Sequence, residues 1–272
     1  LVDKGISNVE SWTTVLIDSL KHINSTEIEL HSASDNYVNS NESNYNFSNY
    51  IKIKKIQGET SRKSKTVEGI VFSKKLPLKT MPSQLENPKI MLITFPIEYD
   101  QDKDNKLHFQ SLEAVIAQQD EYIKKLVDRI LNSKPGVIVS TKSVNGLALK
   151  LFADKNIAVL PECKLSNLIK LSKFTDSTII TSIDILAMKP KLGTCGLFSS
   201  LSFRHENIVK SYISFDKCPN KIGLTIVLRD PNEEILSKIK SCLTIMMYVF
   251  ANLKLESSFL RDQCLKLQDS SE

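Results

Sequence analysis

Positively charged side chains gather between residues 52 and 65, and a cluster of this kind can bind phosphates or carboxylates. The members are Lys52, Lys54, Lys55, Arg62, Lys63 and Lys65. If they face one way, they would meet the phosphates of an anionic membrane or the acidic patch of a partner protein. The other interpretation, which we favour, is a solvated edge strand whose lysines prevent pairing with another sheet. Nucleic acid is not supported, because no aromatic residues alternate with these cations as a stacking platform requires.

No catalytic motif accompanies the cations. The sequence contains no G-x-S-x-G, no H-E-x-x-H, no kinase H-R-D or D-F-G, and no glycine-rich loop for ATP. The segment KLGTCG at 191–196 is rich in glycine but lacks the spacing of a phosphate-binding loop, so we interpret it as a tight turn. Glu98, Asp184 and Glu206 are isolated acids, which favours surface or capping roles over catalysis. We expect no catalytic residue and no cofactor site in this segment.

The thiols and imidazoles are scattered along the chain. They are Cys163, Cys195, Cys218, Cys242, Cys264, His22, His31, His108 and His205. Because no C-x-x-C pair occurs, we expect no metal site, and reduced thiols in the cytosol are the natural interpretation. No apolar run approaches the roughly 20 residues that a membrane-spanning helix needs. The chain begins at Leu1 and shows no signal peptide, so we expect a piece of a longer protein.

The composition is that of a globular protein. The 272 residues fit one large domain or two smaller ones, and 41% are hydrophobic and 25% charged. The formal net charge of +5 permits an acidic partner or an anionic membrane surface but does not require one.

The cationic segment is flanked by elements that the periodicity of apolar residues predicts. Helical spacing over residues 1–31 predicts a helix, with Trp12 as a core anchor. Residues 32–49 are rich in Ser and Asn and predict a loop. Residues 50–56 alternate like an exposed strand, with Ile51 and Ile53 inward and Lys52 and Lys54 outward. A long helix is predicted at about 232–260.

The centre of the chain predicts a parallel sheet. Apolar runs at 69–72 and 89–95 predict strands joined by a proline-rich connector, and the second run suits a strand buried on both faces. Later helices are predicted at 107–132, 144–154 and 165–173, and strands at 137–140, 157–160 and 178–181. This β–α–β–α–β order is typical of a parallel sheet with covering helices. Runs at 207–215 and 222–228 are expected to form an antiparallel pair.

Several sequence blocks resemble a known family, in the same order. They are YIKIKKI at 50–56, the whole 69–95 block, PGVIV at 135–139, KLGTC at 191–195 and LESSFL at 255–260. The 69–95 block is similar to the entry to the apical domain of eukaryotic and archaeal chaperonins. The full series resembles the chaperonin-like domain of the phosphatidylinositol-3-phosphate 5-kinases, the PIKfyve family, and runs from Trp12 to about Asp262. The composition, rich in Asn and Lys, favours a fungal source.

The resemblance implies an α/β fold. Residues 69–224 would form a GroEL-apical-like domain with a parallel-sheet β–α–β core and covering helices. Residues 1–68 and 225–272 would form the smaller helical and β intermediate-like domain into which it is inserted.

The resemblance also implies a non-catalytic role. In chaperonins an aspartate on the last long helix activates water for ATP hydrolysis, and its place here falls on Ser237. A serine hydroxyl cannot serve as that base. The chaperonin strand before this helix ends Leu-Arg-Gly-Gly, whereas this one ends Leu228-Arg229-Asp230-Pro231. The equatorial domain with its nucleotide-binding loop is missing as well, so ATP and magnesium would act only in the kinase domain of the parent.

The partners implied by the family are a HEAT-repeat scaffold protein and the phosphoinositide phosphatase of the kinase complex. The parent would act on the cytosolic face of endosome or vacuole membranes. We expect the 98–131 segment and the 144–173 helices to meet the partner. Two alternatives stay open at this point, namely a module that binds anionic membrane surfaces and a fragment of a folding chaperonin subunit.

Overall fold

The computed structural model describes residues 9–25, 51–58, 60–99, 112–188, 190–205, 208–220 and 223–269. The chain divides into two compact units, one of residues 1–67 with 222–272 and one of residues 68–221. The terminal unit is therefore built from both ends of the chain, and the central unit lies between them in the sequence. The names apical-like and intermediate-like for these parts, and the boundaries after 68 and 224, stay predictions. The loop predicted at 32–49 lies outside the described residues.

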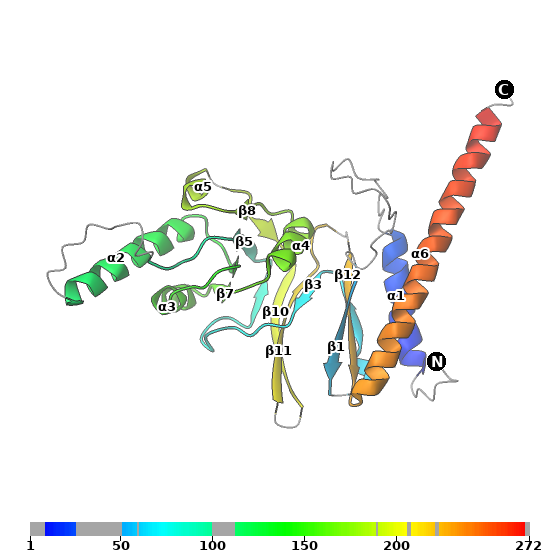
Figure 1. Cartoon of the computed structure of the whole chain (residues 1–272), viewed down its shortest axis with the longest axis horizontal. Coiled ribbons are helices and arrows are strands. Elements are labelled where there is room, and N and C mark those ends of the chain that lie inside the picture. Colours follow the sequence, from blue (N-terminus) through cyan, green and yellow to red (C-terminus); the bar gives the residue numbers. More distant parts are fainter. Residues whose placement is uncertain are drawn as a thin grey trace. The chain divides into compact units, whose positions relative to one another are not determined.

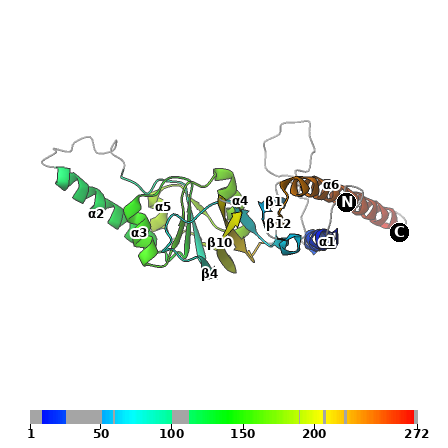
Figure 2. The ribbon, with the colours of Figure 1, turned by 90° about the horizontal axis from the view of Figure 1, so that it is seen from below.

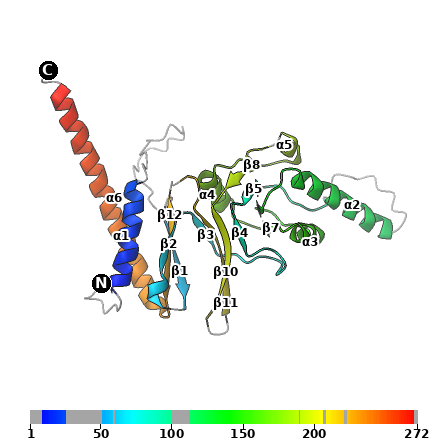
Figure 3. The ribbon, with the colours of Figure 1, turned by 180° about the vertical axis from the view of Figure 1, so that it is seen from behind.

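The terminal unit is a three-stranded sheet with two helices. Its elements are α1 (Val9–Ser25), β1 (Ile51–Gln57), the 3-10 helix η3 (Ser61–Lys63), β2 (Lys65–Val67), β12 (Leu224–Asp230) and α6 (Glu233–Asp269). The order is β1-β12-β2, with β12 parallel to β1 and antiparallel to β2. Both helices lie on one side of the sheet (Figures 1 and 3).

A single hydrophobic cluster holds this unit together. It joins Trp12 of α1, Ile51 of β1, Leu228 of β12 and Leu236 of α6. Trp12 is only 1% exposed, which confirms its predicted role as a core anchor. Because Ile51 and Leu228 sit on strands from opposite ends of the chain, this burial ties the two ends together.

The central unit contains a parallel sheet and a second, antiparallel one. Its elements are β3 (Ile70–Phe72), β4 (Gln84–Glu86), β5 (Lys89–Ile93), α2 (Leu112–Leu131), β6 (Val137–Ser140), α3 (Gly146–Asp154), β7 (Ala158–Leu160), α4 (Leu165–Thr175), β8 (Ile179–Ile180), α5 (Ile183–Ala187), β9 (Gly193–Thr194), β10 (Leu197–His205) and β11 (Ile208–Asp216). The parallel sheet has the order β7-β6-β5-β8, which confirms the predicted α/β core. The antiparallel sheet has the order β3-β11-β10-β4.

The parallel sheet is buried on both faces. One face packs on α2 and α3 through residues such as Met91, Ile138 and Phe152. The other face packs on α4 and on the antiparallel sheet through residues such as Leu92 and Phe215. Figure 2 shows α2 and α3 on one side of the strands and α4 and β10 on the other. Burial on two faces explains why β5 reads as an unbroken apolar run.

Two sequence predictions fail in this region. The runs at 207–215 and 222–228 do not pair, because β11 pairs with β10 and β3 whereas β12 pairs with β1 and β2. The unit boundary falls between them, so their short connection joins two units and is not a hairpin. Residues 193–194 form the strand β9 along β5 where a tight turn was predicted. Glycine is needed there because a Cβ would lie 2.5 Å from Thr175 Oγ1.

Candidate functional site

The structure distributes the predicted cationic residues over both edges of the terminal sheet. Lys54 of β1 and Lys65 of β2 both pair with Val227 of the central strand, so they lie in one row on the same face. Two strand spacings place their Cα atoms about 10 Å apart. Lys52 lies on that same face, because alternate residues of a strand share a face.

The remaining cations lie elsewhere. Arg62 and Lys63 belong to η3 and are exposed. Lys55 follows Ile51 and Ile53 on the opposite face of β1, toward α6. The six residues are thus not brought together on one surface, and their binding to a lipid or another anion stays a prediction.

Lys55 is held by the first turns of α6. Its Nζ donates a hydrogen bond of 3.0 Å to Ser237 Oγ and lies 3.8 Å from Glu233 Oε1. The neighbouring Lys54 is half-buried, and that burial, with a smaller contribution from the charge of Lys240, lowers the pKa of its ammonium group. Burial and these contacts make Lys54 and Lys55 weaker candidates for anion binding than exposed lysines.

A shallow hollow of about 430 Å³ lies beside Ser237. It is lined by Lys55, Ser237, Lys240, Ser241, Thr244 and Ile245. The hydroxyls of Ser237, Ser241 and Thr244 donate to backbone carbonyls one turn earlier in the helix. Lining residues therefore offer ammonium groups and hydroxyls but no carboxylate that could take a proton from water.

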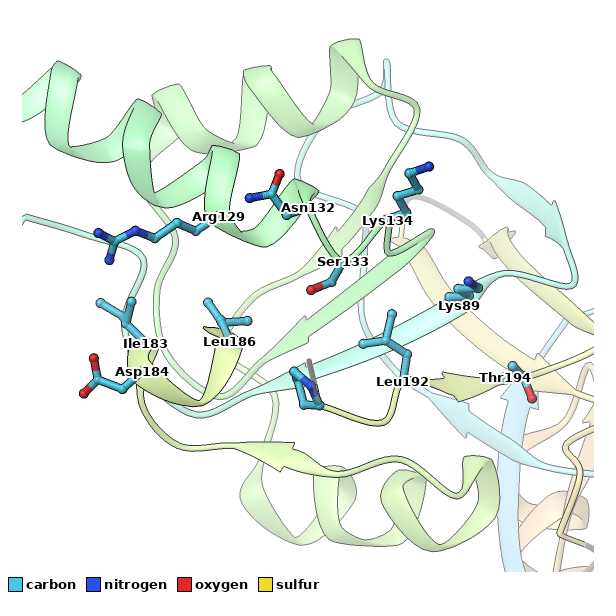
Figure 4. Close-up of a pocket in the computed structure, with 11 residues that line it drawn as sticks. Lys89, Arg129, Asn132, Ser133, Lys134, Ile183, Asp184, Leu186, Leu192 and Thr194 are labelled. Atoms are coloured by element: carbon cyan, nitrogen blue, oxygen red, sulfur yellow. The ribbon is translucent and has the colours of Figure 1, made fainter. Parts of the chain in front are cut away.

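A larger pocket, of about 980 Å³, lies in the central unit at the C-terminal end of α2 (Figure 4). It is lined by Lys89, Arg129, Asn132, Ser133, Lys134, Ile183, Asp184, Leu186, Pro190, Leu192 and Thr194. Of these residues, Asp184 stands out in the sequence as an isolated acid, and Leu192 and Thr194 lie in the glycine-rich segment 191–196. The lining residues come from separate stretches, at 89, 129–134, 183–186 and 190–194, which share no local motif, so no sequence pattern would have grouped them.

Two of the three isolated acids lie in the described part of the structure. Asp184 is exposed in the first turn of α5, and Glu98 is exposed beyond the end of β5. Glu206 lies outside the described residues.

The volume of the pocket at the C-terminal end of α2 is sufficient for a small molecule or a short peptide.

The helices expected to meet a partner expose apolar side chains. Ile116 and Tyr122 of α2 and Leu165 and Ile169 of α4 are each at least 40% exposed. The ring of Tyr122 packs edge-to-face on Tyr99 at a centroid distance of 5.6 Å. Because α2 and α4 cover opposite faces of the parallel sheet, these residues do not form one surface. Contact of either helix with a partner stays a prediction, and residues 100–111 lie outside the described part.

The buried cysteines Cys163, Cys195 and Cys218 keep their thiol protons at neutral pH. Burial raises the pKa of Cys163 to about 11 and that of Cys195 and Cys218 to about 12. In the described ranges, no three His, Cys, Asp or Glu residues lie close enough together to hold a metal ion. Nor does any described helix have the length and apolarity that crossing a membrane demands.

Known proteins resemble this chain in sequence and in fold. Residues 28–260 match the TCP-1/cpn60 chaperonin family. The chain is 38% identical over 267 residues to the 1-phosphatidylinositol 3-phosphate 5-kinase FAB1 of Saccharomyces cerevisiae, which covers 98% of this chain and 11% of that protein. It is 33% identical to the human 1-phosphatidylinositol 3-phosphate 5-kinase over 79% of this chain and 10% of that one.

True chaperonins are more distant. Identity to T-complex protein 1 subunit gamma of Thalassiosira weissflogii is 25%, over 92% of this chain and 46% of that protein. The fold is similar to that of an open-state monomer of a group II chaperonin from Methanococcoides burtonii, with a TM-score of 0.59 and 22% identity over 75% of this chain and 44% of that one. These matches confirm the family resemblance and the fold class. The chain spans only about a tenth of the length of the kinases it matches.

Proposed function

The chain belongs to the TCP-1/cpn60 chaperonin family, and we propose that it is a non-catalytic protein-interaction domain within a 1-phosphatidylinositol 3-phosphate 5-kinase. The observation that carries this proposal is the environment of Ser237. In a chaperonin this position would hold the carboxylate that activates water. Here a hydroxyl occupies it, donates its proton to the Glu233 carbonyl and accepts a hydrogen bond from Lys55.

This arrangement supports a loss of ATP hydrolysis. A hydroxyl bonded to an ammonium group cannot accept a proton from water at neutral pH. The same argument disfavours a fragment of a working chaperonin subunit, despite the match to the T-complex protein. In this proposal ATP and magnesium serve the kinase domain of the parent, outside these 272 residues.

The proposed partners are the HEAT-repeat scaffold protein and the phosphoinositide phosphatase of the kinase complex, at the cytosolic face of endosome or vacuole membranes. The exposed apolar residues of α2 and α4 support a protein partner, since the buried core of a protein interface is more apolar than the rest of the surface. These residues lie within the 98–131 and 144–173 segments, which we expect to contact the partner.

The test is co-purification of the 272-residue chain with the scaffold–phosphatase pair by size-exclusion chromatography. We expect a stable complex, and we expect the paired change Leu165→Glu with Ile169→Glu on α4 to disrupt it. A matched control is Ile17→Glu on α1, whose side chain is similarly exposed at 49%. A folded chain that forms no complex would contradict the proposed function.

A second test uses the parent kinase. Deleting residues 69–224 should abolish association with the scaffold while leaving the chemistry of the isolated kinase domain intact. Retained association in that deletion would contradict the proposal, and the circular dichroism of the remaining protein controls for its folding.

A further inference from the structure

The pocket at the C-terminal end of α2 carries an excess of positive charge. Lys89, Arg129 and Lys134 line it against a single carboxylate, that of Asp184. All four side chains are exposed, and among the described residues none of them has an ion-pair partner. Unpaired cations around a hollow attract an anionic ligand.

The opposite wall of the pocket is apolar and firmly held. Ile183, Leu186 and Leu192 line it. Leu186, 7% exposed, belongs to a hydrophobic core cluster of the central unit, and the partly buried Ile183 and Leu192 pack against that cluster. In Figure 4 the side chains of Leu186 and Leu192 point into the space below Ser133. A ligand that fills this space therefore needs an apolar group.

The cations stand apart from one another instead of converging on one point. Figure 4 shows Arg129 over Ile183 at one end of the pocket and Lys89 near Thr194 at the other. Lys89 and Thr194 are register partners on β5 and β9, so they share one face of that sheet. Separate negative charges along an extended ligand match this spacing better than one concentrated charge.

The end of α2 disfavours a phosphate group in particular. Phosphates bind at helix N-termini, where free N–H groups and the positive end of the helix dipole meet. This pocket instead borders a helix C-terminus, whose dipole end is negative. A carboxylate carries a single negative charge, whereas a phosphate monoester carries about 1.5 to 2, so the same helix end repels a carboxylate less.

We propose that this pocket binds an acidic peptide of a partner protein. Its carboxylates pair with Arg129 at one end and with Lys89 and Lys134 toward the other, and an apolar side chain between them packs on Leu186 and Leu192. The inference rests on the proposed function in one respect, namely that this segment binds proteins. It adds that one of the contacts is made by an acidic peptide in this pocket.

The experiment measures peptide binding to the 272-residue chain by fluorescence anisotropy. The labelled peptide has two central leucines with glutamates on both sides. The double variant Arg129→Glu with Lys134→Glu should weaken binding at least about tenfold, because each new carboxylate repels the carboxylates of the peptide that the native cation attracts. Asp184→Asn should tighten binding, since it removes the only acidic side chain among the described residues that line the pocket. The matched control is Lys150→Glu with Lys155→Glu, which changes the net charge equally on exposed lysines outside the pocket.

Further measurements test the apolar and the electrostatic parts of the proposed peptide contact. A peptide in which serines replace the leucines should bind more weakly, and binding should fall as salt is raised. Equal loss of binding in the control variant, no effect of Asp184→Asn, or no binding at all would overturn the inference. So would full competition by inositol hexakisphosphate together with indifference to the leucines, because the pocket would then be a small-anion site.

Co-purification with the scaffold–phosphatase pair separates this inference from the proposed function. If the wild-type chain forms the complex but binds no peptide, only the pocket inference fails. If the chain binds the peptide through this pocket but forms no complex, the proposed partners fail and the pocket inference stands.

Discussion

Lys55 and Ser237 join the first strand of the terminal unit to its last helix. The Nζ of Lys55 lies 3.0 Å from Ser237 Oγ, across 182 positions of sequence. Ser237 accepts this hydrogen bond while donating its own proton to the Glu233 carbonyl at 3.0 Å. Because the two residues come from opposite ends of the chain, the bond closes a unit that is interrupted by the entire central unit.

Ser237→Ala should destabilise the terminal unit by about 1 kcal/mol, the usual net value of a hydrogen bond. The control is Ser241→Ala, one turn later on the same helix, whose hydroxyl bonds only to the Ser237 carbonyl at 3.1 Å. This control should be neutral or slightly stabilising, since alanine favours helix. Urea unfolding of both variants, each with and without Lys55→Met, measures the coupling. Equal effects of the two serine substitutions would show that Lys55 contributes nothing.

The periodic elements could be predicted from the sequence because local patterns determine them. The β6 strand lies at 137–140 as predicted, and α4 begins at Leu165 as predicted. In α4 the buried residues Leu168 and Leu171 follow the helical period, and in β6 all four residues are buried, as expected of an apolar run covered on both faces. Local pattern also placed Trp12 and Ile51 in the core.

Strand β10 was missed because its sequence, LFSSLSFRH, lacks a strand pattern. Its serines are accommodated by cross-strand pairing, as in the 2.7 Å contact between the Ser199 and Ser214 hydroxyls. Strand preference depends on such neighbours more than on the residue itself. The pocket escaped prediction for a related reason, because Lys89, Arg129 and Thr194 meet only once β5, α2 and β9 are in place.

Gly69→Ala should destabilise the central unit by about 3 kcal/mol or more, at the upper end of what overpacking costs. A Cβ at this position would lie 2.0 Å from the carbonyl oxygen of Phe215, and the backbone of β11 cannot move aside freely. Gly146→Ala is the matched control, because a Cβ there meets nothing within 4 Å at the start of α3. It should stabilise by about 0.5–1 kcal/mol. Chemical denaturation of the two variants checks the signs, and a tolerated Gly69→Ala would contradict the close approach.

Backbone amides of β5 should exchange with deuterium more slowly than those of the outer part of β10. Met91–Ile93 are 0% exposed and lie between β6 on one side and β8 on the other. Strand β4 pairs with Leu197–Ser199 of β10, and the Ser200 amide donates to the Ser83 carbonyl, so the residues after Ser200 have no strand along that edge in the described structure. Exchange monitored by mass spectrometry over 89–95 and 201–205 measures the difference. Equal rates would indicate that β5 opens as readily as this edge.

The buried thiols should make the stability of the protein fall above about pH 9. The pKa of Cys195 and Cys218 is raised from 9.0 to about 12 in the folded chain, because burial disfavours the thiolate. Between those values the unfolded chain has lost the thiol proton while the folded chain keeps it. The folded state then binds more protons, so the free energy of unfolding falls with rising pH, by up to about 1.4 kcal/mol per pH unit for each thiol.

Urea unfolding between pH 8 and pH 10 measures this slope. Lysines and tyrosines also titrate in alkaline solution, so the informative quantity is the difference between variants. The double change Cys195→Ala with Cys218→Ala should lower the stability at pH 8, because it leaves space in the core, yet flatten its decline above pH 9. Cys242→Ala, at a half-buried position on α6, should leave the decline unchanged. The same steep decline in all three proteins would mean that other groups, and not these thiols, govern alkaline stability.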